Sequence, residues 1–208
     1  MGKAPRFKRG QKAGAVAGRH YVSTLTPLQM LQAACFHEAG HIVAAFALGF
    51  DVVYSIINTN QGKRQYGVGG YTEVRLSFLG KHKNREATIA ASLTPEALKI
   101  RIVQTLAGQV GESCVHGNQR EIKAGAREDE ETAMRWAVWA TRQADGSPAA
   151  EDVISDYLNE RDKEVATLIA TSIEPLCRVG NYLGTHLNER VPGVTLKALV
   201  EGQAVRDE

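Results

Sequence analysis

The chain of 208 residues is poor in cysteine and lacks any long hydrophobic run. Its three cysteines are odd in number and form no C-x-x-C pair, which argues against a disulfide framework and against a cysteine-based metal cluster. We therefore expect each to be a small buried hydrophobe in a reducing compartment: Cys35, Cys114 and Cys177. No segment reaches the roughly 18 consecutive apolar residues of a membrane-spanning helix, so we predict no membrane span.

Aromatic residues are also scarce, at 6% of the chain, and the net charge is only +2. Because no platform of aromatic side chains for stacking bases can be recognised, nucleic acid is an unfavoured partner. Residues 1–19 nevertheless contain several Lys and Arg side chains and no acid. We interpret residues 1–22 as a disordered basic tail rather than an anion-binding arm. Since this tail has no apolar segment, it is not a secretory signal, and we expect a cytoplasmic protein.

The remaining residues, 23–208, have the composition of a globular protein and are predicted to form a single domain that is mainly α with a small β-sheet (α+β). Thr26 and Pro27 suit the start of a helix, and Gly49 suits its C-terminal cap. Later residues predict two strands, over 51–57 and 66–74. They also predict helices over 95–115, 126–144, 176–188 and 196–200, the last with Thr195 as its cap. A further long helix is predicted to begin at about residue 148, and Pro175 should limit or kink it.

Two of these helices have a recognisable buried face. Over 126–144 the spacing places four side chains inward: Met134, Ala137, Val138 and Thr141. Over 95–115 it places five inward: Ile100, Val103, Leu106, Ala107 and Val110. Gly108 and Gly111 in the middle of the second helix lower its intrinsic propensity, so we expect close packing against a neighbouring element there.

The first predicted helix contains the sequence His37-Glu38-Ala39-Gly40-His41, an H-E-x-x-H motif. Residues four apart share a face of a helix, so the imidazoles of His37 and His41 can bind one metal ion. Glu38 then lies beside them, where it can act on a metal-bound water. The alternative is a pair of hydrogen-bonded core histidines, but two His and a Glu on a mostly apolar helix are costly to bury without a partner.

A catalytic zinc has three protein ligands and one open position, and the motif supplies two. No histidine follows His41 closely, and Cys35 lies on the far side of the helix. Spacing alone leaves the third ligand open among His20, His82, His116, His186, Glu73, Glu112, Glu128, Asp129, Glu130 and Glu131. The acids at 128–131 have an alternative role, since negative charge at a helix N-terminus complements the helix dipole.

Four blocks of the sequence resemble the peptidase domain of the FtsH-type ATP-dependent zinc metalloproteases, over about residues 26–200. The first block is the H-E-x-x-H motif with Ile42, Val43 and Ala44 after it. Residues 65–72 are similar to the glycine-containing edge strand of that family, and residues 106–112 to its L-G-G-R-x-A-E block. Residues 124–133 resemble its T-G-A-x-x-D-x-x-x-A-T block. The chain departs from these patterns at Gln109, Gly111 and Ala124.

The resemblance implies a zincin-like helical metallopeptidase domain with Zn²⁺ bound by His37, His41 and Asp129. It also implies an endopeptidase that cleaves flexible or unfolded polypeptides, in which Glu38 activates a zinc-bound water. The alternative is a zinc-binding scaffold or regulatory module without proteolytic activity. Because no G-x-x-x-x-G-K-S/T loop is present, we expect a stand-alone peptidase domain, without the ATPase module and membrane anchor of the family. A homo-oligomer and a separate ATPase are the partners to consider.

Two further interpretations concern the surroundings of the motif. A peptide could add as an extra strand along Val68, Gly69 and Gly70, although these glycines also suit a bulged hairpin. Glu112 could orient a ligand histidine from behind, or it could be a solvated acid on its helix.

Overall fold

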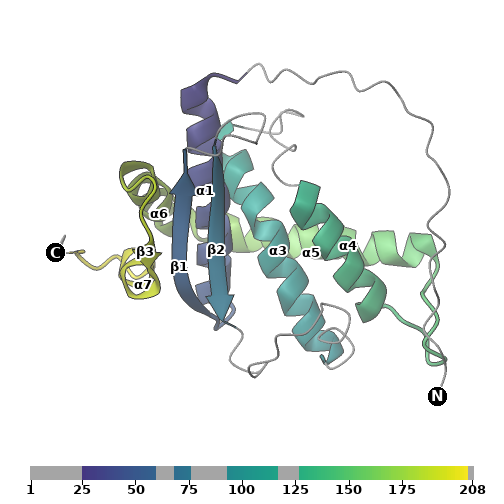
Figure 1. The fold of residues 1–208 in the computed structure, drawn as a ribbon. Coiled ribbons are helices and arrows are strands. Elements are labelled where there is room, and N and C mark those ends of the chain that lie inside the picture. Colours follow the sequence, from purple (N-terminus) through teal and green to yellow (C-terminus); the bar gives the residue numbers. More distant parts are fainter. Residues whose placement is uncertain (1–24, 60–67, 76–92, 117–126, 206–208) are drawn as a thin grey trace.

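The computed structural model describes residues 25–59, 68–75, 93–116 and 127–205. In these ranges the protein is mainly α-helical with a small three-stranded antiparallel sheet, which confirms the predicted mixture (Figure 1). The expected basic tail, residues 1–22, lies outside the described residues. The elements in chain order are α1 (Pro27–Ala47), β1 (Asp51–Asn58), β2 (Gly69–Arg75), α3 (Pro95–His116), α4 (Arg127–Ala140), α5 (Glu151–Ala170), α6 (Ile173–Thr185), β3 (Val191–Pro192) and α7 (Gly193–Val200).

Helix α1 begins and ends where the sequence predicts. The hydroxyl oxygen of Thr26 accepts from the backbone N–H of Gln29, and the side chain of Gln29 accepts in return from the backbone N–H of Thr26. This reciprocal capping, followed by Pro27, provides partners for groups that the first helical turn leaves unpaired. At the other end, Gly49 has a φ of +79°, a conformation that glycine adopts without steric cost.

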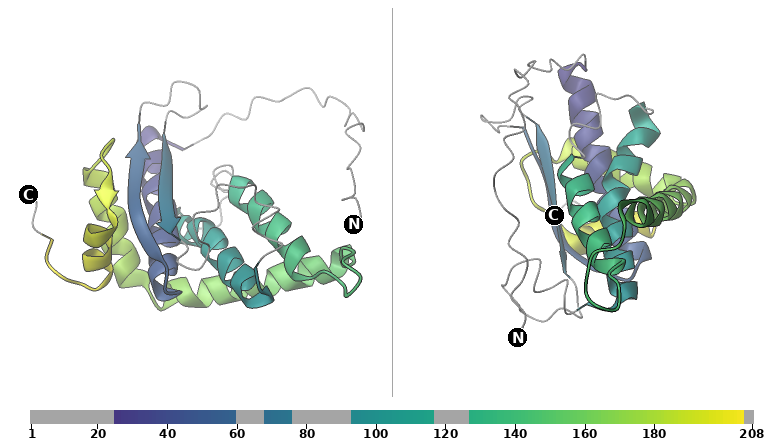
Figure 2. Two further views of the ribbon diagram at one scale, coloured as in Figure 1. Left: turned by 60° about the horizontal axis from the view of Figure 1, so that its bottom comes forward. Right: turned by 90° about the vertical axis from the view of Figure 1, so that its right-hand side faces the viewer.

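The sheet covers one side of α1, and α3 and α6 pack against the helix as well (Figures 1 and 2). The strand order is β2-β1-β3, so β2 is an edge strand of the sheet that the described residues form. In the antiparallel register Ser55 of β1 is opposite Thr72 of β2. The sequence did not predict β3, because a strand of two residues is too short to show an alternating pattern.

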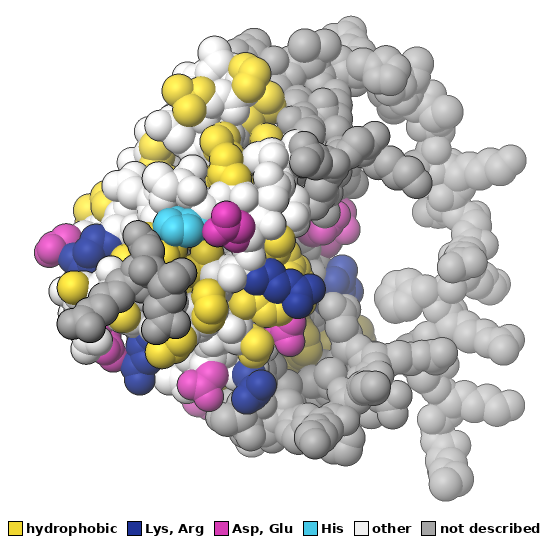
Figure 3. Space-filling view, turned by 60° about the vertical axis from the view of Figure 1, so that its left-hand side comes forward, with side chains coloured by type: hydrophobic (Ala, Val, Ile, Leu, Met, Phe, Trp, Pro, Cys, Tyr) yellow, Lys and Arg dark blue, Asp and Glu magenta, His cyan; other side chains and the backbone are white. Residues whose placement is uncertain are grey.

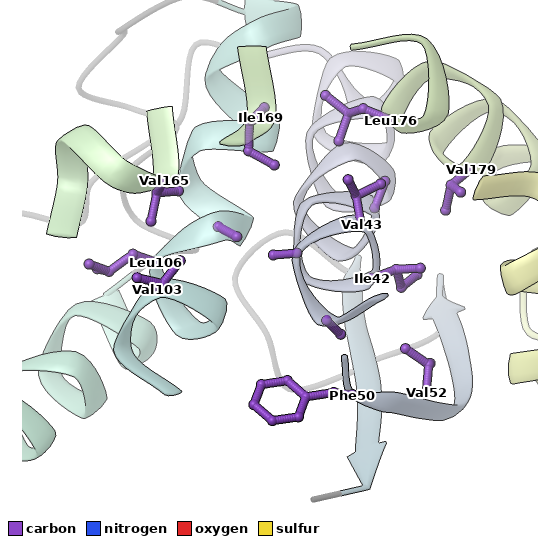
Figure 4. Close-up of a cluster of buried hydrophobic side chains, with 14 of the residues drawn as sticks. Ile42, Val43, Phe50, Val52, Val103, Leu106, Val165, Ile169, Leu176 and Val179 are labelled. Atoms are coloured by element: carbon purple, nitrogen blue, oxygen red, sulfur yellow. The ribbon is translucent and has the colours of Figure 1, made fainter. Parts of the chain in front are cut away.

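The core is one cluster of buried side chains drawn from most elements. Figure 4 shows α1 in the middle of this cluster, with Ile42 and Val43 among side chains from the neighbouring helices and strands. Burial of this apolar surface is the main stabilising contribution, at about 25 cal/mol per Å². Other members labelled in Figure 4 are Phe50, Val52, Val103, Leu106, Val165, Ile169, Leu176 and Val179.

Several predicted boundaries were wrong. Helix α4 ends at Ala140 rather than 144, and α5 begins at Glu151 rather than at 148. Pro175 neither limits nor kinks α5, because that helix already ends at Ala170 and the proline lies in the first turn of α6, where a missing N–H costs little. Helix α7 begins at Gly193 with Pro192 as its N-cap residue, so Thr195 is inside the helix and not its cap.

Two predictions of burial were also wrong. Met134 is 46% exposed, because α4 packs through Ala133, Trp136 and Ala137, a face rotated by one residue from the expected one. Cys35 is buried as expected, but Cys114 and Cys177 are exposed, near the end of α3 and on α6. Among the described residues, no helix is long and apolar enough to cross a membrane.

Candidate metal centre

Three side chains of types that can bind a metal converge between α1 and the first turn of α4. His37 and His41, four residues apart on α1, have their Nε2 atoms 3.1 Å from each other. Asp129 of α4 places its Oδ2 atom 2.9 Å from His37 Nε2 and 3.2 Å from His41 Nε2. Among the described residues, these three form a group that could hold a metal ion.

The second nitrogen of each imidazole has a partner that fixes the tautomer of the ring. His41 Nδ1 lies 3.0 Å from the backbone oxygen of Gln104, which can only accept, so Nδ1 of His41 donates. His37 Nδ1 lies 3.2 Å from Oε2 of the buried Glu112. A neutral ring that donates through Nδ1 presents an unprotonated Nε2. If both rings are neutral, two nitrogen lone pairs and a carboxylate oxygen face one another. Because these electron-rich atoms repel one another, the arrangement requires a positive charge among them, either a proton or a metal ion.

The geometry suits a metal ion as the source of that charge. Ligand atoms about 2.0 Å from a tetrahedral zinc are about 3.3 Å from one another, close to the 2.9–3.2 Å separations of the three atoms. Gly108 of α3 faces the same point: a Cβ atom there would lie 2.5 Å from His41 Nε2 and 2.6 Å from His37 Nε2. Any side chain at Gly108 would therefore crowd both ring nitrogens.

The electrostatics of the group also favour a cation. Burial lowers the pKa of His37, but the hydrogen bonds to Asp129 and Glu112 and the charge of Glu38 outweigh it and raise that pKa to about 10. Burial raises the pKa of Asp129, but its hydrogen bonds with His37 and His41 outweigh burial and lower that pKa well below the usual range. Each shift favours a positive charge at the rings beside an ionised carboxylate.

Glu38 lies between the two histidines in sequence and is 5% exposed. Its Oε2 atom accepts a hydrogen bond of 2.6 Å from Thr72 Oγ1 on β2. Gly70, two residues earlier on the same strand, also faces Glu38, because a Cβ atom on Gly70 would collide with the carboxylate. The start of β2 is thus adjacent to the H-E-x-x-H motif at Gly70. The role of Val68, Gly69 and Gly70 in substrate binding stays a prediction.

The structure places several of the other candidate third ligands elsewhere. His186 stacks on Tyr182 of α6, with 3.9 Å between ring centroids, and lines an open hollow of about 570 Å³ beside α6 and α7. This side of the molecule, shown in Figure 3, mixes hydrophobic with charged side chains. Glu128 and Glu130 flank Asp129 but are exposed. His116 is the last residue of α3, whereas His20 and His82 lie outside the described residues.

Sequence reasoning missed three participants in this centre. The carbonyl group of Gln104 carries no sequence signal, because every residue has one. Thr72 and Ser55 could have been suspected only from their positions in strands that face α1. Gly108 did carry a signal: two glycines inside one helix indicated close packing, and both Gly108 and Gly111 approach α1 closely.

We compared the whole chain with known proteins. Neither a scan against models of protein families nor a search of curated protein sequences finds a match.

Proposed function

We propose that this protein is a zinc-dependent endopeptidase that hydrolyses peptide bonds of flexible or unfolded polypeptides. The observation that carries the proposal is the convergence of His37 Nε2, His41 Nε2 and Asp129 Oδ2 within 3.2 Å, with Glu38 buried next to His37 on the same helix. Two imidazoles and one carboxylate leave a fourth position open on a tetrahedral zinc, as catalytic zinc sites require. A purely structural site needs four protein ligands and no adjacent base.

Each of the chain's own residues has a role in this proposal. His37, His41 and Asp129 would hold Zn²⁺, which supplies the Lewis acidity that activates water and polarises a carbonyl group. Glu38 accepts the proton of the attacking water as general base and then passes it to the leaving amine. The carboxylate of Glu112 and the backbone oxygen of Gln104 fix the two rings so that both Nε2 atoms face the same point.

The edge strand supports a polypeptide substrate. An edge strand has unpaired backbone N–H and C=O groups, to which an extended peptide can add as a further strand. Gly70 of β2 lies against Glu38, so a peptide along this edge would pass close to the general base. Strand addition needs an extended backbone, so we propose flexible or unfolded substrates. A separate ATPase that unfolds proteins, or assembly of several copies, would widen the range of substrates.

The metal ligands are tested by measuring bound zinc. We expect about one zinc per wild-type chain and little in His41→Ala or Asp129→Asn, because a catalytic site keeps only three protein ligands. Glu130→Gln is the matched control, since this exposed acid is the next residue on the same helical turn and should leave the zinc content unchanged. An unchanged zinc content in Asp129→Asn would refute this ligand set.

The activity is tested with casein and with a quenched-fluorescence peptide library. The zinc-loaded wild type should cleave both, whereas Glu38→Gln should bind zinc and cleave neither, because the amide cannot accept the proton of water. Full activity of Glu38→Gln would refute the general-base role. A wild type that binds zinc but cleaves no polypeptide would instead support a scaffold or regulatory module.

A further inference from the structure

The carboxylate of Glu38 is held by a chain of two hydroxyl groups from the sheet. Thr72 Oγ1 donates to Glu38 Oε2 at 2.6 Å, and Ser55 Oγ lies 2.9 Å from Thr72 Oγ1. Ser55 is fully buried, and Ser55 and Thr72 are cross-strand partners of β1 and β2. Their side chains therefore lie on the face of the sheet that packs against α1.

The direction of these hydrogen bonds follows from the groups themselves. An ionised carboxylate only accepts, so the single hydroxyl proton of Thr72 is committed to Glu38. The contact between the two hydroxyls must then use the proton of Ser55. Of the two acceptors near the Ser55 hydroxyl, Thr72 Oγ1 at 2.9 Å is closer than the backbone oxygen of Tyr71 at 3.3 Å. The two hydrogen bonds therefore run in one direction, from Ser55 through Thr72 to Glu38, and each bond polarises the next.

The same strand approaches the other carboxylate oxygen through a residue that has no side chain. Side chains two residues apart in a strand point to the same face, so Gly70 and Thr72 both face Glu38. Thr72 occupies Oε2, while Gly70 approaches Oε1 without a side chain that would cover it. One oxygen of Glu38 thus accepts a hydrogen bond from Thr72, and the other lies against Gly70, which offers it no side-chain donor.

We propose that Thr72 is a positioning residue for proton transfer, and that Ser55 orients it. Its hydrogen bond keeps Oε2 occupied, so Oε1 is the atom that takes the proton from water and returns it to the leaving amine. Oε2 accepts from Thr72 in both states of Glu38, because protonation at Oε1 leaves Oε2 as an acceptor. The inference rests on the proposed peptidase function.

The test compares variants that differ at one hydroxyl. Thr72→Val removes the donor and keeps the branched shape, Thr72→Ser keeps the donor, and Ser55→Ala removes the second member of the chain. Thr141→Val is the control, since it removes a hydroxyl that donates to the backbone oxygen of Ala137 at the end of α4. The measurements are kcat and KM on a fluorogenic peptide, bound zinc, and a crystal structure of each zinc-loaded variant.

We expect kcat of Thr72→Val to fall by about tenfold or more, within the contribution of general acid–base catalysis, with KM and zinc content unchanged. Thr72→Ser should recover most of kcat, Ser55→Ala should show a smaller loss, and Thr141→Val should equal the wild type. In the crystal structures the Glu38 carboxylate should turn away from its wild-type position in Thr72→Val and keep it in Thr72→Ser.

Three results would overturn the inference while leaving the peptidase function intact: wild-type kcat in Thr72→Val, equal losses in Thr72→Val and Thr72→Ser, or an unmoved Glu38 in Thr72→Val. If Thr72→Val does not fold, Ser55→Ala decides, because it leaves Thr72 in place and removes the group that orients it. Wild-type kcat together with an unmoved Glu38 in Ser55→Ala would then overturn the inference. A zinc-loaded wild type without cleavage would instead refute the proposed function itself.

Discussion

Gly108 of α3 faces His41 of α1 so closely that a Cβ atom on Gly108 would lie 2.5 Å from His41 Nε2. The same atom would lie 2.6 Å from His37 Nε2. A methyl group at position 108 would thus lie beside the two nitrogen atoms that would bind a metal. The packing of α1 on α3 and the geometry of the candidate metal centre therefore depend on the same residue.

Gly108→Ala should sharply reduce zinc affinity, because the methyl group would compete for space with the metal and displace the rings. Zinc titration with a competing chelator measures the effect, and we expect a loss of at least about tenfold, comparable to disturbing the surroundings of metal ligands. Gly184→Ala on α6 is the control, since its Cβ would meet only Cys35 Sγ at 3.8 Å. Equal zinc affinity of Gly108→Ala and wild type would contradict this role.

Gly111→Ala should lower stability with or without zinc. Its Cβ would lie 2.5 Å from the backbone oxygen of Phe36 and 3.0 Å from Gly40 Cα, so α1 and α3 would have to separate. Overpacking costs about 1–3 kcal/mol, while alanine gains about 1 kcal/mol of helix propensity over glycine. We expect the free energy of unfolding to fall in denaturant titrations because the clash is with rigid backbone. In Gly184→Ala only the gain in propensity should remain.

Zinc should stabilise the folded protein, because the three ligands come together only after folding. At a free zinc concentration 100-fold above Kd the expected gain in unfolding free energy is about 2.7 kcal/mol. Thermal unfolding with zinc and with a chelator measures it. Asp129→Asn should show a much smaller shift in Tm, whereas Glu130→Gln should behave as the wild type. A Tm of the wild type that does not respond to zinc would argue against the centre.

Cys35 should react far more slowly than the other two cysteines. Cys35 is 2% exposed, and its burial, together with the negative charge of Glu38, raises the pKa of the thiol to about 12. A raised pKa leaves little thiolate at neutral pH, and the thiolate is the reactive form. Iodoacetamide should therefore modify Cys114 and Cys177 in the folded protein and Cys35 only after unfolding, as peptide mass analysis would show. Rapid modification of Cys35 under native conditions would contradict its burial.

The sequence predicted those parts of the fold that local patterns encode. Thr26, Pro27 and Gly49 marked both ends of α1, because caps depend on residues close to the helix ends. The same kind of reasoning failed for Met134, since the buried face of α4 is set by its neighbours and one residue of rotation moves a side chain from the core to solvent. It also failed for β3, whose two residues are held by pairing with Tyr54 and Ser55 of β1.

The sequence by itself determined one side of the candidate centre, because His37, Glu38 and His41 are placed together by the geometry of a single helix. It left the third ligand open on spacing alone, and only a resemblance to a known family suggested Asp129. The tertiary structure brought Asp129, Gly108, Glu112 and Thr72 to that helix from three other elements. These contacts span from 34 to 88 residues of sequence, so they arise from the packing of α3, α4 and β2 around α1 and not from any local pattern.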